Sequence, residues 1–401
     1  MRASRIILLA TLLAVALLAA CGQSALPARQ RPSGSAAGGA QVSDSPPDAT
    51  PRPLPRFSDW RVAYIGPDGR LRAVTLDGKS TAVGLALPIR GFTGSGVFAA
   101  GVSPDGARLA YLSDGLLTIV DTRAGTLRRA YIHSGDSPLS WSPDGRWLAL
   151  NEAGRVMRVS GADLSQTLMP PPAPSAASAL AVSGPDGWLD ATHVGVTYLP
   201  GSSDSRTSYQ SLDLASGALR PIATVAANQG ATFSAQPGGA STLFWTARYR
   251  GDPYVAQAAL IDNVTGAQTP LPAITAALSN YGFLALLWRP NSTQALAVTM
   301  YRTQSGLLYF LLDSAHDTAT QITLPAYPEA WTPDGTALLL AASAQQPIAE
   351  DAPGFTDTGA LGSGPYTLSI APLAATGAPG PSTMLTTRAM TIPTLGFVRT
   401  A

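Results

Sequence analysis

Few side chains in this sequence have the types and spacing that catalysis or metal binding requires. The three histidines, His133, His193 and His316, show no mutual spacing that suggests a set of metal ligands. Ser137, Asp190 and His193 supply the residue types of a Ser-His-Asp triad, but Asp190 stands where the chain pattern places a turn. No Gly-x-Ser-x-Gly motif is present. We therefore expect no enzyme activity, no metal and no cofactor.

The single cysteine, Cys21, is the one residue whose position predicts a specific reaction. Arg2 and Arg5 precede an apolar run from Ile7 to Leu18, and small residues lead to Cys21. This order is typical of a secretory signal peptide. The stretch Leu-Ala-Ala-Cys resembles the lipobox of bacterial lipoproteins. That resemblance implies cleavage before Cys21, a diacylglyceryl group on its thiol and a lipid anchor in the cell envelope.

The next segment predicts a tether. Residues 22–56 are rich in Pro, Ser, Gly and Ala and contain almost no large apolar side chain, so they cannot form a core. A flexible chain of this length reaches roughly 30 Å. We expect a signal peptide over residues 1–20, an anchored disordered tether over 21–56 and a globular body over 57–401.

The composition favours strands and turns over helices. Only 13% of the residues are charged, Lys79 is the only lysine, and glutamate occurs only at positions 152, 329 and 350. Lysine and glutamate are common helix formers, whereas the plentiful Asp, Gly and Pro favour turns. The net charge is +1, or about −1 without Arg2 and Arg5, so the sequence lacks the basic excess typical of nucleic-acid binding.

A short phrase repeats along the body: an apolar or aromatic residue, then Ser/Thr-Pro-Asp-Gly, then an apolar run. Clear copies of the phrase begin at Val102, Trp141 and Trp331. Weaker copies begin at Phe57, Trp188, Phe233 and Trp288. Pro-Asp-Gly at 67–69 and 185–187 is out of phase with the strands. Proline and glycine in this order form hairpin turns, and each unit predicts four strands.

The spacing of these units predicts a closed ring of small sheets. Four-stranded propeller blades repeat about every 40–45 residues, and seven units fit the chain. The phrase resembles the WD40-like repeat of TolB-type β-propellers. We predict an all-β propeller of seven four-stranded blades, with six, the number in TolB, as the alternative. The tail Met390–Ala401 predicts a last strand that completes the first blade.

The connections between second and third strands predict a binding face. All of them should lie on one face of the ring, and they are longer in the later four units than in the second and third. Loops on a rigid scaffold often carry binding sites, and Arg and Tyr are frequent in contact hot spots. The candidate binding residues are Arg206, Arg248, Tyr249, Arg250, Tyr254, Tyr301 and Arg302.

The sequence therefore predicts a membrane-anchored, extracytoplasmic β-propeller that binds a protein or glycan partner and is monomeric. The alternative is a propeller hydrolase or lyase that acts on a saccharide or lactone with acids near the central channel. An accurate structure separates the two, because an enzyme needs two or three carboxylates, or a His with carboxylates, that converge at the channel mouth. A third role, in envelope assembly, follows only from the analogy with TolB.

Overall fold

We analysed a computed structural model of the protein. The residues that it describes are 60–66, 68, 70–86, 99–113, 115–132, 139–152, 155–169, 181–199, 207–225, 229–236, 238–248, 255–301, 307–343, 366–389 and 396–399. They belong to one compact unit, Pro55–Ala401. Cys21 and the predicted signal peptide and tether lie outside the described residues.

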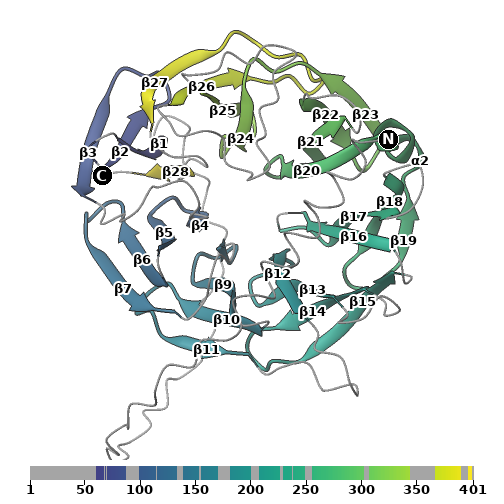
Figure 1. The fold of residues 1–401 in the computed structure, drawn as a ribbon. Helices are drawn as coiled ribbons and strands as arrows, with labels where there is room; N and C mark the ends of the chain where they lie inside the picture. Colours follow the sequence, from purple (N-terminus) through teal and green to yellow (C-terminus); the bar gives the residue numbers. More distant parts are fainter. Residues whose placement is uncertain are drawn as a thin grey trace, which may run out of the picture. The chain divides into compact units, whose positions relative to one another are not determined.

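The described chain forms seven antiparallel four-stranded sheets, which we call blades A to G, arranged in a ring (Figure 1). From the innermost strand outward, the first three blades are A, β28 (Gly396–Arg399), β1 (Trp60–Ile65), β2 (Arg70–Thr75), β3 (Thr81–Ala86); B, β4 (Ala99–Val102), β5 (Arg108–Ser113), β6 (Leu116–Asp121), β7 (Leu127–Tyr131); and C, β8 (Ser140–Trp141), β9 (Trp147–Glu152), β10 (Arg155–Ser160), β11 (Gln166–Leu168).

The other four blades are D, β12 (Ala181–Trp188), β13 (His193–Leu199), β14 (Thr207–Asp213), β15 (Leu219–Val225); E, β16 (Gln229–Ala235), β17 (Ser241–Arg248), β18 (Val255–Asp262), β19 (Gln268–Pro270); F, β20 (Tyr281–Trp288), β21 (Gln294–Tyr301), β22 (Leu307–Asp313), β23 (Thr318–Ile322); and G, β24 (Tyr327–Trp331), β25 (Ala337–Ser343), β26 (Tyr366–Pro372), β27 (Thr383–Ala389). The prediction of a seven-bladed propeller is confirmed. The sequence did not predict the short helix α2 (Pro272–Leu278) that follows β19.

The end of the chain closes the ring. The C-terminal strand β28 pairs antiparallel with β1, with Val62 opposite Phe397, and so supplies the innermost strand of blade A. The predicted role of the tail is confirmed. Phe57, which the repeat spacing assigned to the first unit, lies outside the described residues.

The Ser/Thr-Pro-Asp-Gly phrase forms the hairpin between the first and second strands. In blade C the Ser142 hydroxyl donates to the Asp144 carboxylate over 2.6 Å and accepts the amide of Trp147 over 2.9 Å. Asp144 also accepts the amide of Arg146 over 3.0 Å, and Gly145 adopts a φ of 69°. The same bonds recur at Ser103 and at Thr332. Each residue of the phrase therefore has a separate task in one turn.

The two out-of-phase copies do not form such hairpins. Asp68 follows β1, the second strand of blade A, and Pro185 lies inside β12 at a register shift. The repeat unit therefore follows the phase of the strands and not the Pro-Asp-Gly tripeptide.

The core lies between neighbouring blades, and tryptophans at the ends of innermost strands join one blade to the previous one. Trp141 donates its indole N–H to the carbonyl of Gly101 over 3.0 Å, Trp188 to Ser140 over 3.2 Å, and Trp331 to Leu287 over 2.9 Å. In each case the acceptor immediately precedes the last residue of the previous innermost strand. A buried indole needs such a partner. These tryptophans therefore wedge between neighbouring blades.

Blade E packs with different residues, whereas blade F keeps the tryptophan: Trp288 donates its indole N–H to Oγ of Ser234 in blade E over 3.0 Å. In blade E the strand-end position is Ala235, while Phe233 stacks on Tyr209 of blade D with ring centroids 4.5 Å apart. In blade F, Arg289 stands at the serine position and reaches blade G. Its Nε donates to the carbonyl of Gly335 over 2.7 Å, and its guanidinium lies 5.2 Å from the Trp331 ring centroid.

Candidate functional site

The propeller has two unlike faces. We call the face with the first-to-second hairpins the turn face, because turns of adjacent blades contact each other there: Arg108 donates to Gly145, and Gln236 to Ser292. Second strands begin at the turn face and end at the opposite one, which we call the loop face. The predicted long connections must therefore leave from the loop face.

The lengths of the connections on the loop face differ as the sequence predicts. The short ones run from Ile65 to Arg70, from Ser113 to Leu116 and from Glu152 to Arg155. The longer connections, in blades D to G, run from Leu199 to Thr207, from Arg248 to Val255, from Tyr301 to Leu307 and from Ser343 to Tyr366. The connections thus have four, two and two residues in blades A, B and C, and seven, six, five and 22 residues in blades D, E, F and G.

The predicted binding residues belong to these long connections. Arg248 and Tyr301 are the last residues of β17 and β21, where their backbones pair with Gln229 and Tyr281. Arg206, Tyr249, Arg250, Tyr254 and Arg302 lie outside the described residues. The structure therefore places two of the seven at the loop-face ends of neighbouring second strands.

Blade G brings a carboxylate and two phenols together near the loop face. Glu329 lies on the innermost strand β24, at a register shift between Pro328 and Ala330, and its Oε1 atom is buried. A β-bulge re-aims a side chain, and such bulges are common next to functional sites. Tyr327 begins the same strand, and Tyr366 is buried at the start of β26.

The tyrosines beside Glu329 stay protonated. Burial raises the pKa of Tyr327 and of Tyr366, and the negative charge of Glu329 raises both pKa values further. Both phenols are therefore hydrogen-bond donors at neutral pH, next to a group that accepts hydrogen bonds. Sequence reasoning did not single out these three residues; the rarity of glutamate in the chain was the one signal that pointed to Glu329.

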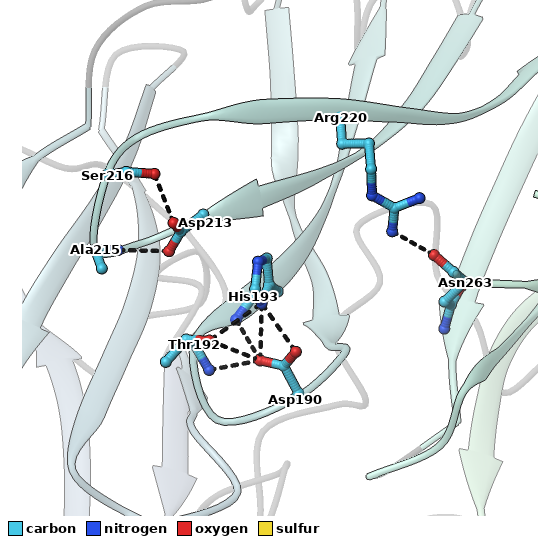
Figure 2. A network of polar contacts seen from close by, with 8 residues as sticks. All are labelled: Asp190, Thr192, His193, Asp213, Ala215, Ser216, Arg220 and Asn263. Carbon is cyan, nitrogen blue, oxygen red and sulfur yellow. Dashed lines mark hydrogen bonds and ion pairs between the residues drawn. The ribbon is translucent and has the colours of Figure 1, made fainter. Parts of the chain in front are cut away.

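The turn face carries a polar network around Asp190 in blade D (Figure 2). The Oδ1 atom of Asp190 accepts the amides of Thr192 and His193, each over 2.7 Å, and Nδ1 of His193 lies 2.8 Å from Oδ2. Desolvation alone would raise the pKa of Asp190, but these amide hydrogen bonds hold it below its ordinary value. In the next turn, the Ser216 hydroxyl lowers the pKa of Asp213.

This network has the geometry of a turn, and its described hydroxyl, that of Thr192, does not stand where a triad nucleophile would. An ionised carboxylate only accepts, so Nδ1 of His193 is the donor to Asp190. A triad nucleophile must lie at the other ring nitrogen, whereas the Thr192 hydroxyl lies 3.1 Å from Nδ1 itself. Ser137 and His133 lie outside the described residues. His316 makes a similar contact, 3.0 Å from Asp313. The expectation that Asp190 is a turn residue is confirmed.

Within the described part of the chain, no group of three or more His, Cys, Asp or Glu side chains is placed to hold a metal ion. The innermost strands contain two acidic residues, Asp186 in β12 and Glu329 in β24. No helix among the described residues is long and apolar enough to span a membrane.

Comparison with known proteins identifies the fold. No protein-family model matches the sequence, and no curated protein matches it. An oligogalacturonate lyase from Vibrio parahaemolyticus is 11% identical over 82% of this chain and 84% of that chain, with a TM-score of 0.52. A prolyl endopeptidase is 12% identical over 82% of this chain and 50% of that chain, with a TM-score of 0.50.

TolB from Acinetobacter baumannii also matches, at 13% identity over 65% of this chain and 62% of that chain, with a TM-score of 0.42. At these identities a structural likeness shows the fold alone, because propellers of one architecture carry many unrelated functions. By its seven four-stranded sheets, the chain is a seven-bladed β-propeller.

Proposed function

We propose that the protein is a membrane-anchored, extracytoplasmic propeller lipoprotein that binds a protein or glycan partner through the loop face of blades D to G. The observation that carries this proposal is the uneven distribution of second-to-third connections. Long connections leave from four consecutive blades, and short ones from the other three. A rigid ring whose longer connections all leave from one arc has more chain available for contacts there, and loops on a rigid scaffold often carry binding sites.

The chemistry at this arc supports binding. Arg248 and Tyr301 end two of its strands, and Glu329 with Tyr327 adds an acceptor and a donor at blade G. Arginine and tyrosine make strong contacts at interfaces because they combine apolar area with directional hydrogen bonds. The same donors and acceptors suit the hydroxyl groups of a glycan.

Affinity capture from envelope extracts tests the binding face. The variant Arg248→Ala/Tyr249→Ala/Arg250→Ala changes the loop face, and Arg123→Ala/Arg146→Ala is the control on the turn face. We expect the first variant to lose at least tenfold in captured partner, and the control to match the unmodified protein. Equal capture by both variants would argue against this face. Turnover of saccharides by the purified protein would instead favour the hydrolase or lyase alternative.

The lipid anchor needs a separate test. The variant Cys21→Ala removes the only thiol of the chain. Mass spectrometry of the unmodified protein should find an N-terminal residue 21 that carries acyl chains, and the variant should leave the membrane fraction or remain unprocessed. An unmodified residue 21 in the mature protein would refute the anchor and leave the binding face untouched.

A further inference from the structure

The outer rim of the ring has an unusual charge pattern. The seven outermost strands, β3, β7, β11, β15, β19, β23 and β27, contain no Asp or Glu. Strand β7 is the most basic of them, since Arg128 and Arg129 are both exposed there. On β15, Arg220 donates to the carbonyls of Asn263 and Val264. The rim of blade B is therefore a basic edge with no acidic residue on its outermost strand, although Asp121 ends the neighbouring strand β6.

Three of the five exposed large hydrophobic residues in the described chain lie on this arc of the rim, and the other two are Met384 on β27 and Val264 after β18. Tyr131, at the end of β7, is 80% exposed, Val83 on β3 is 55% exposed, and Leu168 on β11 is 38% exposed. Gln166 of β11 donates its side-chain amide to the carbonyl of Tyr131 over 3.1 Å, which ties the edges of blades B and C together. None of the described side chains on β15, β19 or β23 is a large exposed hydrophobic residue.

We propose that this rim patch, Val83, Arg128, Arg129, Tyr131 and Leu168, rests on the headgroup layer of an anionic lipid membrane. Arginine and tyrosine beside apolar side chains form the composition that membrane–water interfaces favour. The inference rests on the proposed function, because the lipid anchor would hold the ring beside such a surface.

A second copy of the chain fits this edge less well. Pairing β7 with another β7 would bring the adjacent arginines of the two strands together, and like charges across a strand pair are destabilising. An anionic membrane surface has the charge opposite to that of the arginines, and contact with it does not require the alignment of residues that strand pairing requires. Charge complementarity therefore favours the membrane as the occupant.

The point where the chain enters the ring adds a second argument. Trp60 opens β1, an inner strand of blade A, so the described chain enters the ring in the blade next to the one that carries Arg128, Arg129 and Tyr131. A short tether gives an effective concentration in the mM range, which lets a weak contact become populated. Each cation near an anionic membrane adds about fivefold in affinity, and salt screens the effect.

The test uses the full, lipidated chain in vesicles. Because Cys21 would be acylated, a cysteine introduced at exposed Thr167 on β11 would be the only free thiol, and it carries a fluorophore. A cysteine at exposed Thr320 on β23 is the matched position on the far rim. The vesicles contain a headgroup nitroxide quencher, in either neutral phosphatidylcholine or a mixture with phosphatidylglycerol.

We expect the label at 167 to be quenched at least threefold more than the label at 320 in anionic vesicles, and equally in neutral ones. Arg128→Gln/Arg129→Gln and, separately, Tyr131→Ser should abolish the difference, as should 0.5 M salt. The control Thr320→Glu/Gln321→Glu, which carries only the label at 167, makes the same change in net charge on the far rim and should leave the quenching at 167 unchanged. Thermal unfolding confirms that each variant is folded.

Equal quenching at both positions in anionic vesicles would overturn the rim contact. So would quenching at 167 that is unchanged by Arg128→Gln/Arg129→Gln and by Tyr131→Ser. A chain that fails to stay with neutral vesicles would refute the anchor instead. In that case, binding of the chain to anionic vesicles that depends on Arg128 and Arg129 would still support the rim patch, and its absence would overturn the patch as well.

Discussion

Thr122 and Arg399 meet across the closure of the ring, although 277 residues separate them in the sequence. The Thr122 hydroxyl donates to the backbone carbonyl of Arg399 over 2.7 Å, and the Arg399 amide donates to the carbonyl of Gly106 over 2.8 Å. The last strand is thus fastened to two turns of blade B as well as to β1.

Removing the Thr122 hydroxyl should weaken this closure. Thr122→Val keeps the shape of the side chain and leaves the Arg399 carbonyl without its donor, so we expect a loss of about 1 kcal/mol in the free energy of unfolding. Urea denaturation measures it. Phe397→Ala, which empties part of the same strand's core contact, should cost about 3–5 kcal/mol. If Phe397→Ala left the free energy of unfolding unchanged, β28 would not hold the ring closed.

Arg289 and Trp331 should couple across the boundary of blades F and G. The guanidinium lies over the ring, and the indole N–H bonds to Leu287. A double-mutant cycle with Arg289→Met and Trp331→Phe should give a coupling of about 0.5–2 kcal/mol in unfolding free energy. Strictly additive changes would mean that the stacked contact contributes nothing.

Substitutions at two glycines should distinguish the cost of backbone strain from the cost of a steric clash. Gly106 and Gly125 have φ values of 69° and 65°, but a Cβ on Gly106 would lie 2.3 Å from Cζ3 of Trp60, whereas Gly125 faces open space. Gly125→Ala should cost about 1–2 kcal/mol for the left-handed backbone alone. Gly106→Ala should cost about 1–3 kcal/mol more, because Trp60 must move. Equal losses in thermal or urea unfolding would contradict the close approach of the Trp60 ring.

Stability should fall in acid because turn aspartates have low pKa values. Hydrogen bonds from Ser160 and Ser165 lower the pKa of Asp163 to about 2, and turn hydrogen bonds also lower the pKa of Asp262. Since the folded pKa values lie below the unfolded ones, the stabilisation is present above about pH 4 and is lost as the pH falls toward 2. Urea midpoints between pH 7 and pH 2 measure this, and Asp262→Asn should flatten the slope. A midpoint that rises in acid would reverse the assigned sign.

Much of the fold follows from sequence because each turn is local. Ser142, Asp144 and Gly145 bond within one hairpin, so the phrase alone specifies the turn, and its spacing sets the number of blades. Helix α2 has no such local signal. Its N-terminal amides at Ala273 and Ile274 bond to Asp317 of blade F, so a contact from the next blade, invisible in the local pattern, supports it.

The candidate site was harder to predict for the same reason. The position of Glu329 depends on a bulge in β24, and its effect on Tyr366 depends on strands separated by the connection after Ser343. The lengths of the connections predict which arc of the ring carries the candidate face, whereas the approach of a carboxylate and two phenols arises only from the pairing of distant strands.

Site-specific photo-crosslinking in intact cells tests the binding face most directly. A photoreactive residue at position 249 reports on the loop face of blade E, and one at exposed Ala124 reports on the turn face of blade B. The proposal predicts a partner adduct of discrete mass at 249 and none at 124, with the adduct lost when Arg248 and Arg250 become alanine. An adduct at 124 with none at 249 would contradict it.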